Sequence, residues 1–202
     1  MNEIDAVVFD VGGVLIDWNP EYLYTKLISD PVDRRHFLTE VCTPDWNAAQ
    51  DAGRSWEEAV QTLSAEHPHH AELIAAYDLR WEEMVAGPIP ESVEVLEELR
   101  QRGIPNYALT NFSSEKWKVA IGLWPFLDRF NGVVVSGEEG IVKPNLAIYR
   151  LLLDRFDLAH ERTFYLDDRP ENVRAAGELG MQADLFTGAP SLRRRLDGLL
   201  AD

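Results

Sequence analysis

Four short runs of apolar, β-branched and aromatic residues show no helical period, and they are the feature that most limits how this chain folds. They lie at residues 6–9, 106–109, 132–135 and 163–166. Such runs are typical of parallel strands buried on both faces. Helical patterns occur beside and between them, at residues 92–102, 115–123 and 146–156. This alternation predicts an α/β fold with a Rossmann-like parallel sheet in a three-layer α/β/α core.

From about residue 19 to residue 87 the alternation stops, because each stretch has a helical pattern and no strand candidate appears. Helices are expected to begin after Pro20, after Pro31 and at Ser55, where Glu58 completes a capping box. A last helix is expected over about residues 70–85, and a loop over residues 43–54. We therefore predict a core domain of residues 1–18 and 88–202, with residues 19–87 inserted as a helical cap domain.

Polar residues follow each predicted strand or lie in the connection after it. Asp10 follows the first strand, Thr110-Asn111 the second and Asp167-Asp168 the fourth, while Lys143 lies after the third. Taken singly, each has an ordinary explanation as a turn residue, a helix cap or a solvated side chain. In an open parallel sheet, however, reactive groups gather just beyond the carboxyl ends of the strands. The joint pattern therefore predicts one site at that edge.

The same residues belong to four motifs in a fixed order. The first is VVFDVGGVL at residues 7–15, and the second is LTN at residues 109–111. The third is Lys143-Pro144 followed by Ile148-Tyr149, and the fourth is FYLDD at residues 164–168 with Asn172 and Gly180. Together they resemble the haloacid dehalogenase-like (HAD) hydrolase superfamily, in the branch with a helical cap between the first two motifs. The resemblance covers essentially the whole chain.

The resemblance implies that Asp10 is a nucleophile, which in a phosphatase would form an aspartyl phosphate. It also implies Mg²⁺, an ion that prefers oxygen ligands, bound by Asp10, the Gly12 carbonyl and Asp168. Asp167 and Asn172 are expected behind these ligands.

The transferred group also needs donors that stabilise its charge. Thr110 and Lys143 are the expected catalytic donors, and Asn111 is expected to bind phosphate with them. A nearby ammonium such as that of Lys143 would also lower the pKa of Asp10.

One position departs from the family pattern. Phosphatases of this kind usually carry an aspartate two residues after the nucleophile, where it protonates the leaving group, and here that residue is Gly12. The dehalogenase branch has tyrosine there and typically lacks the acidic pair Asp167-Asp168. The pair favours a phosphatase for a small phosphorylated metabolite, such as a sugar phosphate. A 2-haloacid dehalogenase and a non-catalytic binding protein on the same fold remain alternatives.

The predicted cap offers further candidates for substrate contact in the stretch at residues 43–54. They are Trp46, Asn47, Asp51 and Arg54, and Trp46 could equally belong to the core of the cap. Specificity is expected in this part, because a cap closes over the site and excludes water.

The charge of the chain limits its partners. Its 35 acidic and 19 basic residues give a formal net charge of -16, which repels nucleic acid and anionic lipid. A single cysteine, Cys42, an acidic start and apolar runs far shorter than about 20 residues predict a cytoplasmic protein without a membrane segment. We expect a small-molecule substrate and either a monomer or a homodimer.

Overall fold

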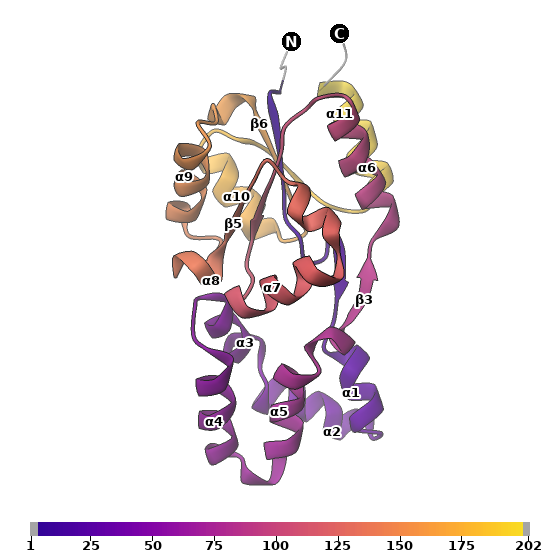
Figure 1. Ribbon diagram of the computed structural model, residues 1–202, viewed down its shortest axis with the longest axis vertical. Helices are drawn as coiled ribbons and strands as arrows, with labels where there is room; N and C mark the ends of the chain where they lie inside the picture. Colours follow the sequence, from indigo (N-terminus) through magenta and orange to yellow (C-terminus); the bar gives the residue numbers. More distant parts are fainter. Residues whose placement is uncertain (1–3, 200–202) are drawn as a thin grey trace.

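A sheet of five parallel strands lies at the centre of one part of the computed structural model, which describes residues 4–199 (Figure 1). The strand order is β5-β4-β1-β6-β7. The strands are β1 (Ala6–Phe9), β4 (Asn106–Thr110), β5 (Gly132–Val135), β6 (Thr163–Asp167) and β7 (Gln182–Leu185). The order reverses direction at β1, so its carboxyl end faces the crevice where such sheets bind ligands.

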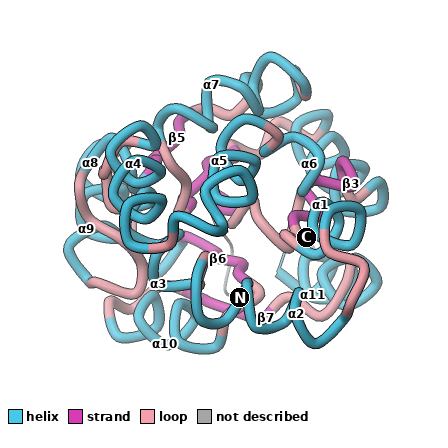
Figure 2. Tube along the Cα trace, turned by 90° about the horizontal axis from the view of Figure 1, so that it is seen from below, coloured by secondary structure: helices cyan, strands magenta, loops and turns pink. Residues whose placement is uncertain are grey.

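Helices cover both faces of this sheet, as the end-on view in Figure 2 shows. Val7 and Phe9 pack with apolar residues of α6 (Pro90–Gln101), α7 (Ser114–Leu123) and α11 (Ala189–Leu199). Val8 points to the other face, where α9 (Leu146–Arg155) and α10 (Pro170–Glu178) pack. Because successive strand residues point to opposite faces, a strand buried on both sides reads as an unbroken apolar run. The predicted three-layer Rossmann-like fold is confirmed.

The chain between β2 (Ile16–Trp18) and β3 (Val85–Pro88), residues 19–84, is helical and gathers at the lower end of the molecule in Figure 1; we call it the helical insertion. Its elements are α1 (Glu21–Leu27), α2 (Pro31–His36), the π-helical turn Phe37–Val41, α3 (Pro44–Asp51), α4 (Trp56–Glu66), the 3₁₀ turn Pro68–His70, α5 (Ala71–Leu79) and the 3₁₀ turn Trp81–Met84. Antiparallel pairing of β2 with β3 brings its two ends together. We propose that the boundary between core and cap lies at this ribbon.

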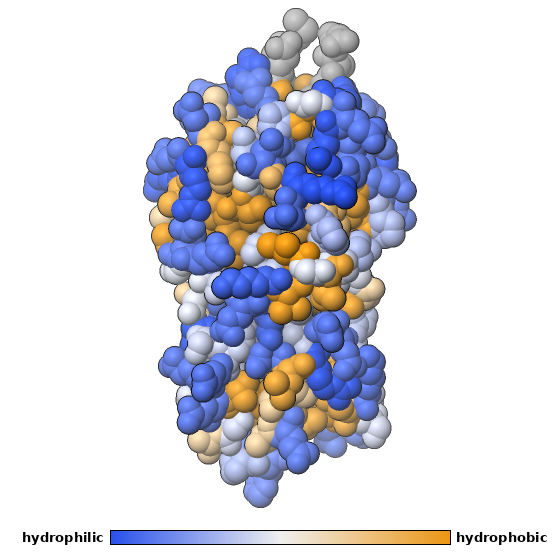
Figure 3. Space-filling view, viewed as in Figure 1, coloured by the Kyte–Doolittle hydropathy of each residue, from blue (hydrophilic) through white to orange (hydrophobic). Residues whose placement is uncertain are grey.

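The remaining elements are short connections on the sheet side. They are the helix α8 (Ser136–Glu139) and the 3₁₀ turns Pro125–Arg129 and His160–Arg162. Figure 3 shows a largely hydrophilic face with apolar surface near the junction of the two parts. No helix among residues 4–199 is long and apolar enough to cross a membrane.

All four predicted strands are present, but three strands were not predicted. β2 has only three residues, and the edge strand β7 carries polar residues at alternate positions, so neither reads as an apolar run. β3 lies where the last insertion helix was expected to end. The helix expected over residues 70–85 is present as α5 (Ala71–Leu79), but its expected end was wrong, because a 3₁₀ turn follows Leu79.

The expected loop over residues 43–54 was also wrong, because most of it forms α3. The Thr43 side chain caps this helix by accepting the Trp46 amide N–H at 3.0 Å, and Pro44 occupies its first turn. Threonine followed by proline is a usual helix start, so the sequence contained the signal. α3 is the element that carries Asn47 and Asp51.

Candidate active site at the carboxyl edge of the sheet

Acidic side chains from two neighbouring strands meet because the strand register places the strand ends side by side. Phe9 of β1 is level with Leu166 of β6, so Asp10 follows β1 beside Asp167. The Asp10 amide N–H donates to the Leu166 carbonyl at 2.8 Å. One carboxylate oxygen from each of Asp10, Asp167 and Asp168 lies within 4.8 Å of the other two. Residues 157 positions apart in the chain thus form one cluster.

Lys143 reaches this cluster from the connection between α8 and α9. Its Nζ lies 2.9 Å from Asp10 Oδ1 and 2.7 Å from Asp167 Oδ2, and the side chain is 1% exposed. Asn111 holds its backbone. The Lys143 amide N–H donates to Asn111 Oδ1 at 2.8 Å, and Asn111 Nδ2 donates to the Lys143 carbonyl at 3.0 Å. The Asn111 side chain, predicted to bind phosphate, therefore positions the lysine in this structure.

Asp167 is fully buried and its carboxylate is surrounded by donors. Besides Lys143, it accepts hydrogen bonds from the Tyr165 hydroxyl, from the Arg169 amide at 2.8 Å and from Asn172 Nδ2 at 3.0 Å. Burial by itself raises the pKa of Asp167, but the Lys143 charge and these hydrogen bonds outweigh it and lower the pKa. Asp167 is thus an ionised group that fixes the ammonium in place.

For Asp10, unlike Asp167, the effects that raise the pKa exceed those that lower it. Burial, together with the negative charges of Asp167 and Asp168, raises its pKa to about 7 against the lowering effect of Lys143. The expected influence of the lysine is present but smaller than that of burial. One ammonium faces three carboxyl groups, so this oxygen-rich site has an excess of negative charge. Such a donor set fits a divalent cation.

Two glycines shape the loop after Asp10 in different ways. Gly13 has a φ of 72°, and a Cβ atom there would collide with the Asp168 carboxylate, whose Cγ would be only 2.9 Å away. A side chain at this position would therefore displace Asp168. At Gly12 a Cβ atom would meet no atom within 4 Å. The absence of an acid at position 12 is therefore not enforced by crowding.

Thr110 ends β4 and is almost completely buried. Among the residues described, its Oγ1 has no hydrogen-bond partner. A buried hydroxyl without a partner costs free energy, so such groups in native proteins usually have a further role. The Thr110 hydroxyl is therefore available as a donor, but Thr110 is not among the residues that line the cavity beside Asp10.

A cavity of about 570 Å³ lies between this edge of the sheet and the helical insertion. Asp10, Lys143 and Asp168 line one end of it. The rest of the wall is largely apolar and aromatic, including Trp18, Leu38, Trp56, Tyr77, Trp81 and Phe112. The reactive groups thus open into a space with walls suited to a hydrophobic group.

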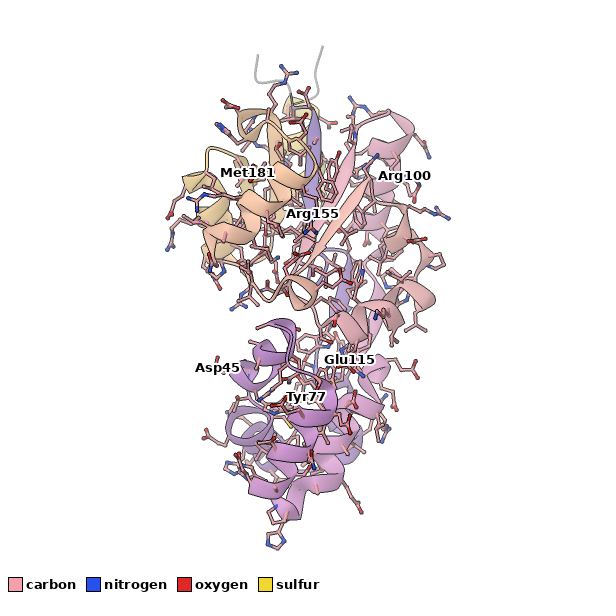
Figure 4. All side chains as sticks on the ribbon, turned by 60° about the vertical axis from the view of Figure 1, so that its left-hand side comes forward. Asp45, Tyr77, Arg100, Glu115, Arg155 and Met181 are labelled. Carbon is pink, nitrogen blue, oxygen red and sulfur yellow. The ribbon has the colours of Figure 1, made fainter. Side chains whose placement is uncertain are left out.

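Contacts with α7 hold the insertion over this cavity. Glu115 Oε1 accepts the Trp56 amide N–H at 3.0 Å, and the indole Nε1 of Trp56 donates to Ser113 Oγ at 2.8 Å. Lys116 bonds to Asp78 of α5 through both the side chain and the carbonyl of that residue. Figure 4 shows side chains of the two parts meeting near Glu115, with Tyr77 inside the insertion.

A family model described as haloacid dehalogenase-like hydrolase matches residues 4–180. The chain belongs to this family of HAD hydrolases. The predicted resemblance is therefore confirmed over most of the sequence.

Several curated relatives of this HAD hydrolase are named as phosphatases. The chain is 27% identical over 176 residues to a sesquiterpene phosphatase of Aspergillus oryzae, covering 87% of this chain and 86% of that protein. It is 33% identical over 98 residues to a glyceraldehyde 3-phosphate phosphatase of Methanocaldococcus jannaschii, covering 46% and 42%. These relatives support a hydrolase and favour a phosphatase over a dehalogenase.

Solved structures show the same fold. A HAD family enzyme from Bacteroides thetaiotaomicron, solved as a magnesium complex, superposes with a TM-score of 0.75 at 20% identity. The match covers 95% of this chain and 98% of that one. At this level of identity the likeness shows the architecture.

The four candidate contacts predicted in the insertion of this HAD hydrolase fall into two pairs. Asn47 and Asp51 line the cavity. Trp46 and Arg54 are not among its lining residues. The Trp46 ring packs edge-on against Trp56 and Tyr77, and Arg54 Nη2 donates to the Trp46 carbonyl at 3.0 Å. The structure therefore places Trp46 and Arg54 in the packing of the insertion.

The aromatic wall of the cavity was not recognised as a site from the sequence. The spacing of Tyr77 and Trp81 in the sequence is typical of packing residues, because aromatic residues at helical spacing usually form a core. They do pack, but one side of each also faces the cavity. Periodicity cannot distinguish a side chain that only packs from one that also lines a cavity. That distinction depends on where α3 and β2 lie across from Tyr77 and Trp81.

Proposed function

We propose that this chain is a Mg²⁺-dependent phosphatase that forms an aspartyl phosphate on Asp10. The supporting observation is the cluster of Asp10, Asp167 and Asp168 beside the buried Lys143 ammonium, at the end of the cavity. Its phosphatase relatives and the oxygen-rich donor set agree with this proposal.

Asp10, the Gly12 carbonyl and Asp168 would hold the metal. When bound, Mg²⁺ would offset the negative charge of the site and bind a phosphate oxygen. The Lys143 ammonium and the Thr110 hydroxyl would donate to the other phosphate oxygens, where charge develops during transfer. Asp167 and Asn111 hold Lys143 in position for this task.

The reaction has two steps. An Asp10 carboxylate oxygen attacks phosphorus, and the bond from phosphorus to the ester oxygen breaks, which releases the alcohol. Water then attacks the phosphorus of the aspartyl phosphate, which releases phosphate and restores the Asp10 carboxylate. Lys143 keeps its proton throughout, because its pKa is raised by Asp10 and Asp167 despite its burial.

We further propose that the substrate is the phosphate ester of a bulky apolar alcohol. Each of the six apolar and aromatic wall residues named above carries at most one hydrogen-bond donor, on an indole or phenol ring, for the several hydroxyls of a sugar. A sugar held against such a wall would lose more hydrogen bonds to water than the wall replaces. The relative named as a sesquiterpene phosphatase agrees with an apolar substrate.

Metal dependence gives the first test. We expect the purified protein to hydrolyse p-nitrophenyl phosphate with Mg²⁺, and EDTA to remove this activity until Mg²⁺ is added back. The reason is that uncompensated carboxylates at the site repel the substrate phosphate. Chloride release from 2-chloropropionate is measured in parallel. Chloride release without metal, together with no phosphate release, would favour the dehalogenase alternative.

Chain length gives the second test. We expect kcat/KM for farnesyl monophosphate to exceed that for glucose 1-phosphate by at least about 100-fold, because each buried CH₂ contributes about 0.8 kcal/mol. Leu38→Asn, in the cavity wall, should lower the value for farnesyl monophosphate. Leu79→Asn, at a position 79% exposed, is the matched control and should leave it unchanged. Equal kcat/KM values for the two substrates would contradict the apolar assignment.

A further inference from the structure

An alcohol is a poor leaving group unless it receives a proton, and Gly12 has no side chain to supply one. The protein has room for an acid at this position, since a Cβ atom at Gly12 meets nothing within 4 Å. Another group facing the cavity must therefore donate the proton if the substrate is an alkyl phosphate.

Most titratable side chains in the cavity wall are unsuited to this task. Lys143 is held charged by its two carboxylates, and Lys116 is paired with Asp78. Burial raises the pKa of Cys42 and of Tyr77, so neither exchanges a proton readily near neutral pH. None of these four groups is therefore suited to protonate the leaving oxygen near neutral pH.

The remaining groups of the wall are one guanidinium and three carboxyl groups. Arg169 keeps its proton at any physiological pH and pairs with Glu171 at 2.8 Å. Asp10 and Asp168 belong to the nucleophile and the metal site in the proposed function. The third carboxyl group is that of Asp51, at the end of α3, and among residues 4–199 it forms no salt bridge with a cation.

Asp51 belongs to the insertion but is anchored on the sheet side. Ser136 Oγ donates to the Asp51 carbonyl at 2.5 Å and accepts the Phe112 amide N–H at 3.0 Å. This hydroxyl therefore ties the end of α3 to the loop that follows Thr110. The position of Asp51 relative to the reaction centre is thereby fixed by the backbone.

The carboxyl group of Asp51 is also oriented. Asn47 Nδ2 donates to its Oδ2 at 3.2 Å, and the Ser113 backbone N–H interacts with it as well. Asp51 lines the same cavity as Asp10, Lys143 and Asp168, so its carboxyl group shares the space into which the reactive groups open. A carboxyl group is therefore held beside the reaction centre, on the insertion side of the cavity.

We propose that Asp51 is the acid and base of this enzyme: it protonates the leaving alcohol and then takes a proton from the attacking water. The proposal rests on the proposed phosphatase function. In the first step the ester oxygen leaves phosphorus and receives the Asp51 proton. In the second step the Asp51 carboxylate accepts a proton from water as the oxygen of that water bonds to phosphorus and the bond to Asp10 breaks. Asp51 is then protonated again.

The protonation behaviour of Asp51 agrees with this role. Burial raises its pKa to about 7, against the lowering effects of the Ser113 amide and the Lys143 charge. Tyr77 of α5 faces it as a neutral phenol. At neutral pH both forms of the carboxyl group are therefore populated, as an acid-base catalyst requires.

The test compares two leaving groups in Asp51→Asn. We expect kcat/KM for farnesyl monophosphate to fall about 10²–10⁴-fold. For p-nitrophenyl phosphate, whose phenolate leaves without a proton, we expect less than a tenfold loss. The wild-type kcat/KM for the alkyl ester should also fall as pH rises above about 7, and this decrease should be absent in the variant. Asp45→Asn, an exposed change of the same kind on the same helix (Figure 4), is the control and should match the wild type.

Two other outcomes distinguish failure of the role of Asp51 from failure of the phosphatase function. Equal loss for both substrates in a folded Asp51→Asn protein, or an unchanged alkaline decrease, would overturn the role of Asp51 while leaving the phosphatase function intact. If the wild type and Asp45→Asn release no phosphate from either ester with Mg²⁺, the proposed function itself fails, and the role of Asp51 fails with it.

Discussion

Asp10→Asn is expected to lower kcat for every phosphate ester by at least about 10⁴-fold, because the side-chain amide cannot form the covalent intermediate. Removal of a group that acts as part of one catalytic unit has effects of this size. The same change removes one predicted metal ligand and one of the two partners of Lys143. Initial rates at saturating Mg²⁺ measure the loss.

The fold should survive this substitution. Because burial raises the pKa of Asp10 to about 7, above its ordinary value of 3.8, its ionised form destabilises the folded protein as pH rises through that pKa. A neutral isostere removes this penalty, and Asp167 still pairs with Lys143. At pH 8 without metal, the melting temperature of Asp10→Asn should therefore equal or exceed that of the wild type.

The control for Asp10→Asn is Asp154→Asn, an exposed carboxylate on α9. Its activity should equal that of the wild type. An acid-quenched reaction should yield a phosphorylated peptide containing residue 10 from the control and none from Asp10→Asn. Undiminished turnover by Asp10→Asn would show that Asp10 is not the nucleophile. A wild type inert toward all esters would favour a non-catalytic binding protein.

The cluster around Asp10 could be predicted because it depends on strand ends. A parallel sheet places the carboxyl ends of its strands at one edge, so polar residues after the apolar runs at 6–9 and 163–166 were expected at the same edge. Their direct contact also requires that β1 and β6 be neighbours, which the strand order of the structure provides. Lys143 lies in a longer connection, and its approach depends on Asn111, whose side chain was not expected to hold a backbone segment.

The cavity could not be predicted, because it is formed by side chains from separate elements. Trp18 belongs to β2, Trp56 to α4 and Tyr77 to α5, and each has the pattern of a core residue. Asp51 was a candidate for substrate contact, but its proximity to Lys143 depends on α3, which was expected to be a loop. The packing of the insertion against α7 determines which side chains keep a face toward the cavity. This packing cannot be predicted from a local sequence pattern.

The negative charge of the chain explains why the site needs the buried cation Lys143. A chain with a net charge of -16 repels a phosphate ester, and the cluster at Asp10 adds to that repulsion. Lys143 is a buried cation that forms ion pairs with Asp10 and Asp167 of this cluster. It therefore supports both the ionised state of Asp167 and the approach of phosphate.

Lys143→Met is expected to affect both stability and activity. Removing one partner of a buried ion pair leaves uncompensated charge, which costs about 3–5 kcal/mol of the free energy of unfolding at neutral pH. The loss of a donor to the transferring phosphate should lower kcat by about 10²–10³-fold. Denaturant unfolding and initial rates measure the two effects. Lys118→Met, an exposed lysine on α7, is the control and should change neither.

The pH dependence of stability separates lost charge pairing from lost packing. In the wild type, Asp167 has a lowered pKa, so it contributes stability above the ordinary value of 3.8, and this contribution is lost as pH falls through its folded pKa. Without Lys143, the largest lowering effect is lost and only the hydrogen bonds from Tyr165, Arg169 and Asn172 oppose burial, so the pKa of Asp167 should rise. The variant should therefore lose stability as pH rises from 5 to 8, and its deficit relative to the wild type should be largest at pH 8. A deficit of equal size at both pH values would mean that Lys143 stabilises the fold by packing, and Asp167 would then not be the ionised partner that holds the lysine for phosphate.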